Sequence, residues 1–135
     1  RFLLTLDQSV ALVLHAMTQA RGGEIFVRKA PASTALALAQ TMVRKYSQHP
    51  ESHEIRSVGI RPGEKIHEIL VNEYELTRSE ESDEFFVIHP EYRLPEHPRA
   101  RPLGEEYTSA NTHQLTDSED IEQLLDAMGQ VEYFL

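Results

Sequence analysis

The sequence predicts an α/β fold, and three observations support this prediction. Segments with strand and helix patterns alternate over residues 1–60, four prolines fall within residues 90–102, and an amphipathic segment lies near the end of the chain. Alternating strands and helices are typical of α/β domains. The chain of 135 residues has the size of one domain or one large lobe. We therefore expect an α/β lobe with an extended arm and a closing helix.

A strand and a helix are predicted at the start of the chain. Residues 2–6 have the composition of a short strand or an extended entry, and Asp7 is placed to cap a helix that ends near Gly22 and Gly23. Apolar residues at helical spacing define this helix: Leu6, Val10, Val13, Leu14 and Met17.

A second strand and helix follow. Residues 24–28 are rich in β-forming residues and lie between the glycine pair and Pro31, which predicts a strand. Ser33 or Thr34 is the predicted cap of the next helix. The apolar face of that helix consists of Ala35, Leu38, Ala39, Met42, Val43 and Tyr46. After a polar linker, a third strand is expected at residues 54–60.

The segment from Arg61 to Lys65 is predicted to end the third strand and to open a short helix, whose first turn tolerates Pro62. The apolar side of this helix consists of Ile66, Ile69 and Leu70. Residues 72–83 are acidic and weakly patterned, and residues 84–89 predict another strand.

The prolines at positions 90, 95, 98 and 102 predict an extended arm. Residues 107–115 have an extended pattern, and Thr116 to Glu119 has the form of a capping box. The closing helix is marked by Ile121, Leu124, Leu125 and Met128 and stops at Gly129. We divide the chain into an α/β lobe at residues 1–89 and an extension at residues 90–135, which is expected to be an appendage that packs on another surface.

Charge and composition exclude several classes of partner. Residues 1–50 carry six Lys and Arg against two Asp and Glu, whereas residues 51–135 carry seven against twenty. Without a basic cluster, binding to nucleic acid or to an anionic membrane is not expected. No apolar run approaches the roughly 20 residues of a membrane span. The absence of cysteine agrees with a cytoplasmic protein, and the absence of both an initiator Met and a signal peptide predicts a piece of a longer reading frame.

The turn from Arg61 to Lys65 is the first candidate binding site. A guanidinium group beside backbone N–H groups at a helix start suits a diphosphate, and Glu64 can accept hydrogen bonds from ribose or sugar hydroxyls. Arg1, directly before the first strand, is a second candidate phosphate ligand, and Lys29 is a third candidate ligand. The alternative for each of these residues is an ordinary surface side chain.

Metal and catalytic sites are not predicted. The chain has seven histidines, and only His49 and His53 have the spacing of a helical metal pair, but Pro50 lies between them. Glu64 and Glu68 have the spacing of paired carboxylates, which is commoner on a solvated face. The sequence contains no nucleophile elbow, no glycine-rich phosphate loop and no dinucleotide fingerprint. We expect no metal, no cofactor and no self-sufficient catalytic centre in this chain.

Three motifs carry a resemblance to a known family: Arg1-Phe2 followed by Leu6-Asp7-x-x-Val10, the segment from Gly22 to Pro31, and the segment from Gly59 to Leu70. Together they resemble the C-terminal, substrate-binding lobe of the extended short-chain dehydrogenase/reductase enzymes that act on UDP-N-acetylglucosamine. These enzymes are the 4,6-dehydratases and dehydratase/5-epimerases of surface polysaccharide synthesis. Residues 91–95 and 106–115 resemble the C-terminal extension of the capsular, CapE-like type.

The resemblance implies roles by position. Arg1 and Arg61 match two arginines that hold the UDP diphosphate, Glu64 matches an acidic residue near the nucleotide, and Lys29 and Ala30 fall in the loop that borders the sugar or uracil pocket. In the family, NAD or NADP and a Tyr-x-x-x-Lys pair belong to an N-terminal Rossmann domain. Neither the fingerprint nor the pair occurs in these residues, so the chain alone is predicted to be inactive.

The resemblance also implies a UDP-amino sugar as the substrate. The family's enzymes oxidise the sugar at C4, eliminate water across C5–C6 and return the hydride at C6. Some members also invert C5. A UDP-glucose 4-epimerase and a non-catalytic nucleotide-sugar-binding or scaffolding lobe remain alternatives. Members are homo-oligomers, and the extended arm is expected to pack against a neighbouring subunit.

Overall fold

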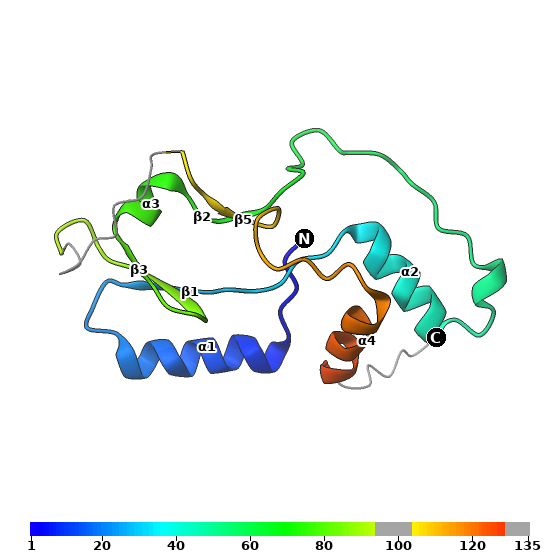
Figure 1. Ribbon diagram of the computed structural model, residues 1–135, viewed down its shortest axis with the longest axis horizontal. Coiled ribbons are helices and arrows are strands. Elements are labelled where there is room, and N and C mark those ends of the chain that lie inside the picture. The colour runs from blue at the N-terminus through cyan, green and yellow to red at the C-terminus, as the bar shows by residue number, and fades with distance from the viewer. Residues whose placement is uncertain (94–103, 129–135) are drawn as a thin grey trace.

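The computed structural model describes residues 1–93 and 104–128, and it confirms the α/β prediction (Figure 1). Helices and strands alternate over the first third of the chain, and short strands dominate the middle. The elements in chain order are α1 (Leu6–Gln19), β1 (Ile25–Arg28), α2 (Ala35–Tyr46), η1 (Pro50–Ser52), β2 (Ile69–Val71), α3 (Glu73–Thr77), β3 (Ser79–Glu81), β4 (Phe85–Ile88), β5 (Tyr107–Thr108) and α4 (Ser118–Ala127).

The described strands form two antiparallel sheets. The larger sheet has the order β1-β4-β3, and the register of its first pair places Ile25 opposite Ile88. The predicted strands at residues 24–28 and 84–89 are therefore confirmed as direct neighbours. In the smaller sheet, β2 pairs with β5 and joins Ile69 to Thr108. Helix α1 lies beside the larger sheet, where its His15 ring stacks on Phe85 with the ring centroids 4.4 Å apart (Figure 1).

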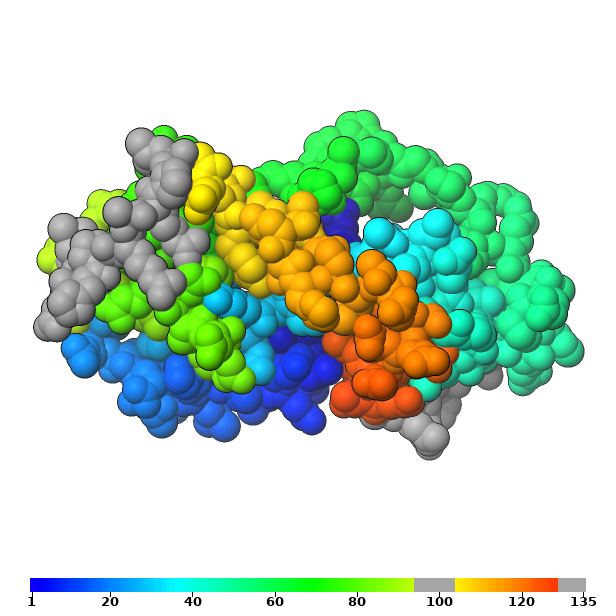
Figure 2. Space-filling view, viewed as in Figure 1, coloured from blue at the N-terminus to red at the C-terminus, as the bar shows by residue number. Residues whose placement is uncertain are grey.

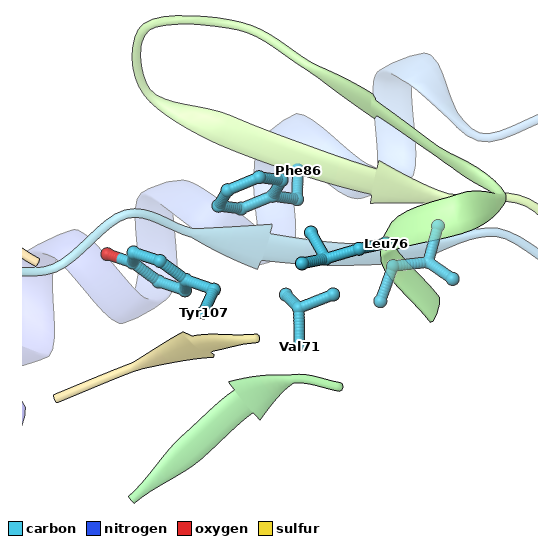
Figure 3. Packing of buried hydrophobic residues seen from close by; sticks show 5 residues of the cluster. Val71, Leu76, Phe86 and Tyr107 are labelled. Carbon is cyan, nitrogen blue, oxygen red and sulfur yellow. The ribbon is translucent and has the colours of Figure 1, made fainter. Parts of the chain in front are cut away.

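The first core cluster lies between the two sheets. Alternation along β4 buries Phe86 and Ile88, because successive side chains of a strand point to opposite faces. These two residues pack with Val71, Leu76 and Tyr107 (Figure 3). The Tyr107 hydroxyl group donates a hydrogen bond to the carbonyl of Ala30 at 3.3 Å. The hydroxyl group of the buried Tyr107 therefore keeps a hydrogen-bond partner.

The second core cluster joins α4 to α2. Leu115, Ile121 and Leu125 are buried, and apolar residues of α2 pack against them. Lys45 Nζ lies 2.7 Å from Asp126 Oδ1, and Arg44 pairs with Glu122 at the same junction. Figure 2 shows residues 104–128 as a band that runs across the molecule from the sheets to α2.

The expectation of a separate appendage is therefore wrong for residues 104–128, since apolar burial holds them on the lobe through both clusters. The predicted arm falls largely on residues 94–103, outside the described part of the chain. The division at residue 89 stays a prediction.

Two predicted helix starts need correction, and residues 2–5 take the extended alternative without forming a strand. Thr5 caps α1 in place of Asp7, because its Oγ1 accepts from the backbone N–H of Gln8 at 3.2 Å while Gln8 Oε1 accepts from the Thr5 N–H at 3.0 Å. Asp117, without a side-chain bond, precedes α4 in place of the predicted box at Thr116. Residues 2–6 form only one isolated bridge, from Phe2 to Ala32. Thr34 is confirmed as the cap of α2, where its Oγ1 accepts from the Ala37 N–H at 3.1 Å.

The middle of the chain differs most from the prediction. Residues 54–60 form an exposed extended segment that has no neighbouring strand among the described residues. The prediction of a third strand at these residues is therefore wrong. The prediction of a short helix after Arg61 is also wrong, since Ile69 and Leu70 belong to β2. The weakly patterned residues 72–83 contain α3 and β3, and Asn72 with Glu75 forms the capping box that begins α3.

Candidate functional site

A groove lies beside Arg1, and we call it the Arg1 groove. It has a volume of about 490 Å³ and is formed by segments far apart in the chain. Its lining residues are Arg1, Ser33, Thr34, Ala35, Gly59, Ile60, Glu64, Lys65, Ile66, His67, Ser109, Ala110 and Gln114.

Backbone hydrogen bonds place Arg1 next to the start of α2. The N–H of Ser33 donates to the Arg1 carbonyl at 2.9 Å, and the amino nitrogen of Arg1 donates to the Ser33 carbonyl at 2.6 Å. Thr34 and Ala35, the cap and first residue of α2, line the groove. A helix N-terminus carries partial positive charge and favours an anion. The groove thus combines an arginine with the positive end of a 12-residue helix.

The Arg1 guanidinium is held by carboxylates. It donates to Glu64 Oε1 at 2.6 Å, to Glu68 Oε1, and to the Lys65 carbonyl at 3.1 Å. All three side chains of this cluster keep more than a third of their surface exposed. An anion that takes Arg1 as a ligand must therefore compete with two carboxylates.

The predicted turn at Arg61 is present, but it does not open a helix. The Glu64 N–H donates to the Arg61 carbonyl at 3.0 Å, and Glu64 Oε2 accepts from the Arg61 N–H at 3.2 Å. Gly63 has a φ of 82°, a left-handed conformation that favours glycine. The exposed Arg61 guanidinium has no ion-pair or hydrogen-bond partner among residues 1–93 and 104–128 and does not line the groove. The structure thus brings Arg1 and Glu64 together and leaves Arg61 in solvent beside them.

Lys29 and Ala30 line a second depression of about 860 Å³ that shares no lining residue with the Arg1 groove. Lys29 Nζ lies 2.6 Å from Glu81 Oε1 and 5.0 Å from the centre of the Phe86 ring. Ala30 is buried, and its carbonyl accepts from Thr112 Oγ1 at 2.7 Å. The structure does not gather the five predicted residues around one cavity.

Sequence reasoning missed the N-terminus of α2 as part of the site. It placed the helix N–H groups after Arg61, whereas residues 62–63 form a turn, residues 66–67 form a bend, and α2 supplies the helix start. The sequence does contain a signal for this helix start, because Ser33 or Thr34 is the predicted cap of a helix with a clear apolar face. What the sequence does not show is that Arg1 lies next to that cap.

The residues present do not fit a dinucleotide cofactor. Gly22 and Gly23 follow a helix and lead into β1, with φ values of 118° and 87°. A dinucleotide fingerprint needs the opposite order, in which glycines follow a strand and open a helix. Within residues 1–93 and 104–128, no three His, Asp or Glu side chains are grouped to hold a metal ion.

The fold is shared with a solved structure. The X-ray structure of Pen from Bacillus thuringiensis matches 95% of this chain with a TM-score of 0.79 and 28% identity. The arrangement is that of a mixed α/β lobe, consistent with the C-terminal lobe of an extended short-chain dehydrogenase/reductase enzyme.

The chain belongs to the polysaccharide biosynthesis protein family, whose model matches residues 1–90. It is similar to the UDP-glucose 4-epimerase of Rickettsia canadensis, with 34% identity over 98% of this chain. It is also similar to the uncharacterized membrane protein MJ1061 of Methanocaldococcus jannaschii, with 39% identity over 67% of this chain.

The chain covers only part of each similar protein: 40% of the Rickettsia protein, 28% of MJ1061 and 38% of Pen. No helix in the described residues is long and apolar enough to cross a membrane.

Proposed function

We propose that this chain is the UDP-sugar-binding lobe of an NAD(P)-dependent enzyme that modifies a nucleotide sugar for surface polysaccharide synthesis. The observation that carries the proposal is the Arg1 groove, where an arginine and the start of α2 face the same space. Membership of the polysaccharide biosynthesis family and the similarity to UDP-glucose 4-epimerases support it.

Each predicted site residue has a role in this proposal. Arg1 and the N-terminus of α2 bind the diphosphate, the free guanidinium of Arg61 adds a second positive charge, and Glu64 accepts from sugar or ribose hydroxyls. Lys29 and Ala30 border the sugar or uracil pocket. Only Pro31 and Ala32 separate Ala30 from Ser33 of the Arg1 groove in the sequence, so one segment of the chain contributes to both depressions.

The remainder of the enzyme binds the cofactor in this proposal, because the residues of this lobe do not fit it. We place the complete enzyme in the cytoplasm, in agreement with the absence of cysteine. We also propose that it forms a homo-oligomer through the arm that follows Pro90.

The reaction proposed first is 4,6-dehydration of UDP-N-acetylglucosamine, with or without inversion at C5. The second candidate is 4-epimerisation of a UDP-sugar, which is favoured by the similarity to proteins named UDP-glucose 4-epimerase.

Mass spectrometry of the product distinguishes the two reactions. The complete enzyme, incubated with UDP-N-acetylglucosamine and NAD or NADP, is expected to give a product lighter by one water, because dehydration removes water across C5–C6. Incubation with UDP-glucose is the matched control. A product of unchanged mass, separable from the substrate by chromatography, would replace the dehydratase with the epimerase. If the enzyme converts neither UDP-N-acetylglucosamine nor UDP-glucose, both proposed reactions are contradicted.

Replacing Glu68 by glutamine is expected to tighten UDP binding about two- to fivefold, because an exposed ion pair that must be broken is worth roughly 0.5–1 kcal/mol. Glu68 competes with the diphosphate for Arg1, whereas glutamine has no charge with which to compete. Titration calorimetry of the chain with UDP measures the change.

The matched control is Glu122→Gln, which removes an exposed carboxylate that pairs with Arg44 at the α2–α4 junction. This control is expected to leave UDP affinity unchanged. Weaker binding by Glu68→Gln would show that Glu68 contributes to the site and does not compete with the ligand.

A further inference from the structure

The C-terminal part of the described chain supplies one wall of the Arg1 groove. Ser109, Ala110 and Gln114 line the groove together with Arg1. The family model matches residues 1–90, so it does not include these three wall residues. Figure 1 shows the segment after β5 beside the N-terminus of the chain. One wall of the candidate site therefore comes from a segment that the family match leaves without a role.

Ser109 bonds to both main-chain groups of Glu68. The Ser109 N–H donates to the Glu68 carbonyl at 2.8 Å, and the Glu68 N–H donates to Ser109 Oγ at 3.0 Å. The first bond can form with almost any residue at this position, whereas the second requires a side-chain acceptor such as a hydroxyl group. Ser109 is only 5% exposed, so water has little access to replace the hydroxyl oxygen. The serine side chain thus has a specific partner in Glu68.

Glu68 in turn orients the Arg1 guanidinium. Nη1 of Arg1 donates to Glu68 Oε1 and to the Lys65 carbonyl. Both acceptors belong to residues 64–68, which lie outside every described helix and strand. Residues 64–67 line the groove. The position of this segment therefore depends on single hydrogen bonds, such as the one from Glu68 to Ser109.

Ser109 is itself held in place by its neighbours. Gln114 Nε2 donates to the Ser109 carbonyl at 3.0 Å. The Thr108 N–H donates to Asn111 Oδ1 at 2.8 Å, and the Asn111 N–H donates to the Thr108 carbonyl at 3.2 Å. A turn that is bonded on both sides of Ser109 therefore presents the hydroxyl group to Glu68.

We propose that Ser109 is a positioning residue of the candidate site: its hydroxyl group fixes the main chain of Glu68, and Glu68 fixes the Arg1 guanidinium that meets a diphosphate. This role rests on the proposed function, because it takes the diphosphate of a nucleotide sugar as the ligand of Arg1. Order that exists before binding lowers the conformational entropy that the ligand must remove. Loss of the Ser109 hydroxyl group leaves the charge of Glu68 in place and releases its main chain. Glu68→Gln does the reverse, so the two changes are expected to shift UDP affinity in opposite directions.

Replacing Ser109 by alanine is expected to weaken UDP binding by the complete enzyme about three- to tenfold, the effect of losing one hydrogen bond between uncharged groups. Ser109→Thr keeps a hydroxyl group and is expected to keep the affinity within about twofold of that of the unmodified enzyme. Titration calorimetry with UDP measures both affinities. An unchanged affinity in Ser109→Ala would overturn the positioning role.

Ser79→Ala is the matched control, because it removes another buried serine hydroxyl group that bonds to the main chain. Ser79 is 3% exposed, its Oγ donates to the Leu76 carbonyl at 3.0 Å, and it does not line the Arg1 groove. Its loss is expected to leave UDP affinity unchanged. Equal weakening in Ser79→Ala and Ser109→Ala would indicate a general loss of stability and would also overturn the positioning role.

Hydrogen exchange in the absence of UDP separates the positioning role from the proposed function. The Glu68 N–H loses its acceptor in Ser109→Ala and is expected to exchange about tenfold faster, with no such change in Ser79→Ala. Mass spectrometry of the peptide that contains Glu68 measures the exchange. If the unmodified enzyme does not bind UDP, the proposed function fails, and the exchange alone decides whether Ser109 fixes Glu68. Unchanged exchange in Ser109→Ala would contradict the role whether or not UDP binds.

Discussion

Replacing Phe86 by alanine is expected to lower the free energy of unfolding by about 3–5 kcal/mol, as large-to-small changes at a buried aromatic residue do. Phe86 is 2% exposed and packs against Val71, Leu76 and Tyr107 between the two sheets. Its ring also lies 5.0 Å from Lys29 Nζ. The total stability of a small domain is about 5–15 kcal/mol, so this loss would remove a large part of it. Urea denaturation followed by circular dichroism measures the change.

The control for Phe86 is Val58→Ala, which removes an apolar side chain that is 82% exposed in the extended segment. It is expected to change the free energy of unfolding by less than about 0.5 kcal/mol. Equal stability of the Phe86→Ala variant and the unmodified chain would contradict the described core.

Replacing Arg61 by alanine is expected to weaken UDP binding about tenfold or more, the effect of losing one charge-assisted contact to a phosphate. Arg61 has no partner among the described residues, so its guanidinium can meet an incoming diphosphate without breaking an existing ion pair. Its backbone N–H and carbonyl both bond to Glu64, which fixes the position of the turn beside Arg1. Titration calorimetry of the chain with UDP measures the affinity.

Arg56→Ala is the matched control for Arg61, because Arg56 is an exposed arginine of the same segment that pairs with Glu54 at 3.2 Å. Its loss is expected to leave UDP affinity unchanged. The same loss in both variants would indicate a general charge effect, and an unchanged affinity in Arg61→Ala would remove Arg61 from the site.

Local patterns predicted those elements whose residues carry their own signal. Residues 24–28 and 84–89 are β-rich, and they form β1 and β4. The helix from Ala35 to Tyr46 has both a cap and an apolar face, and it appears as predicted. These elements depend mainly on propensity, capping and periodicity, which a single sequence contains.

Pairing of distant segments decided the remaining elements. Ile69 and Leu70 have an apolar pattern that also suits a helix, and they form a strand because Tyr107 and Thr108 lie beside them. Residues 54–60 contain β-forming residues but have no such neighbour among the described residues. Strand propensity depends strongly on the neighbouring strand, which the local sequence does not identify.

The candidate site was predictable only in part, for the same reason. The Arg61 turn carries its own signal in Pro62 and Gly63, and it was predicted. The contact between Arg1 and Ser33, the residue before the cap of α2, joins residues that are 32 positions apart. The pairing of Arg1 with Glu68 spans 67 positions, and nothing in the local sequence around either residue indicates it.

The position of Ala32 has a consequence for synthesis of the protein. Ala32 forms bridges with Phe2 on one side and with Gln114 on the other, and Tyr107 packs on both Phe2 and Phe86. The core therefore needs residues that the ribosome adds about 75 positions after Ala32. At roughly 5–20 residues per second, Phe2 and Ala32 wait at least about 4–15 seconds for Tyr107, and Phe86 waits about 1–4 seconds. Chaperones that bind apolar segments have this interval in which to act on the nascent chain.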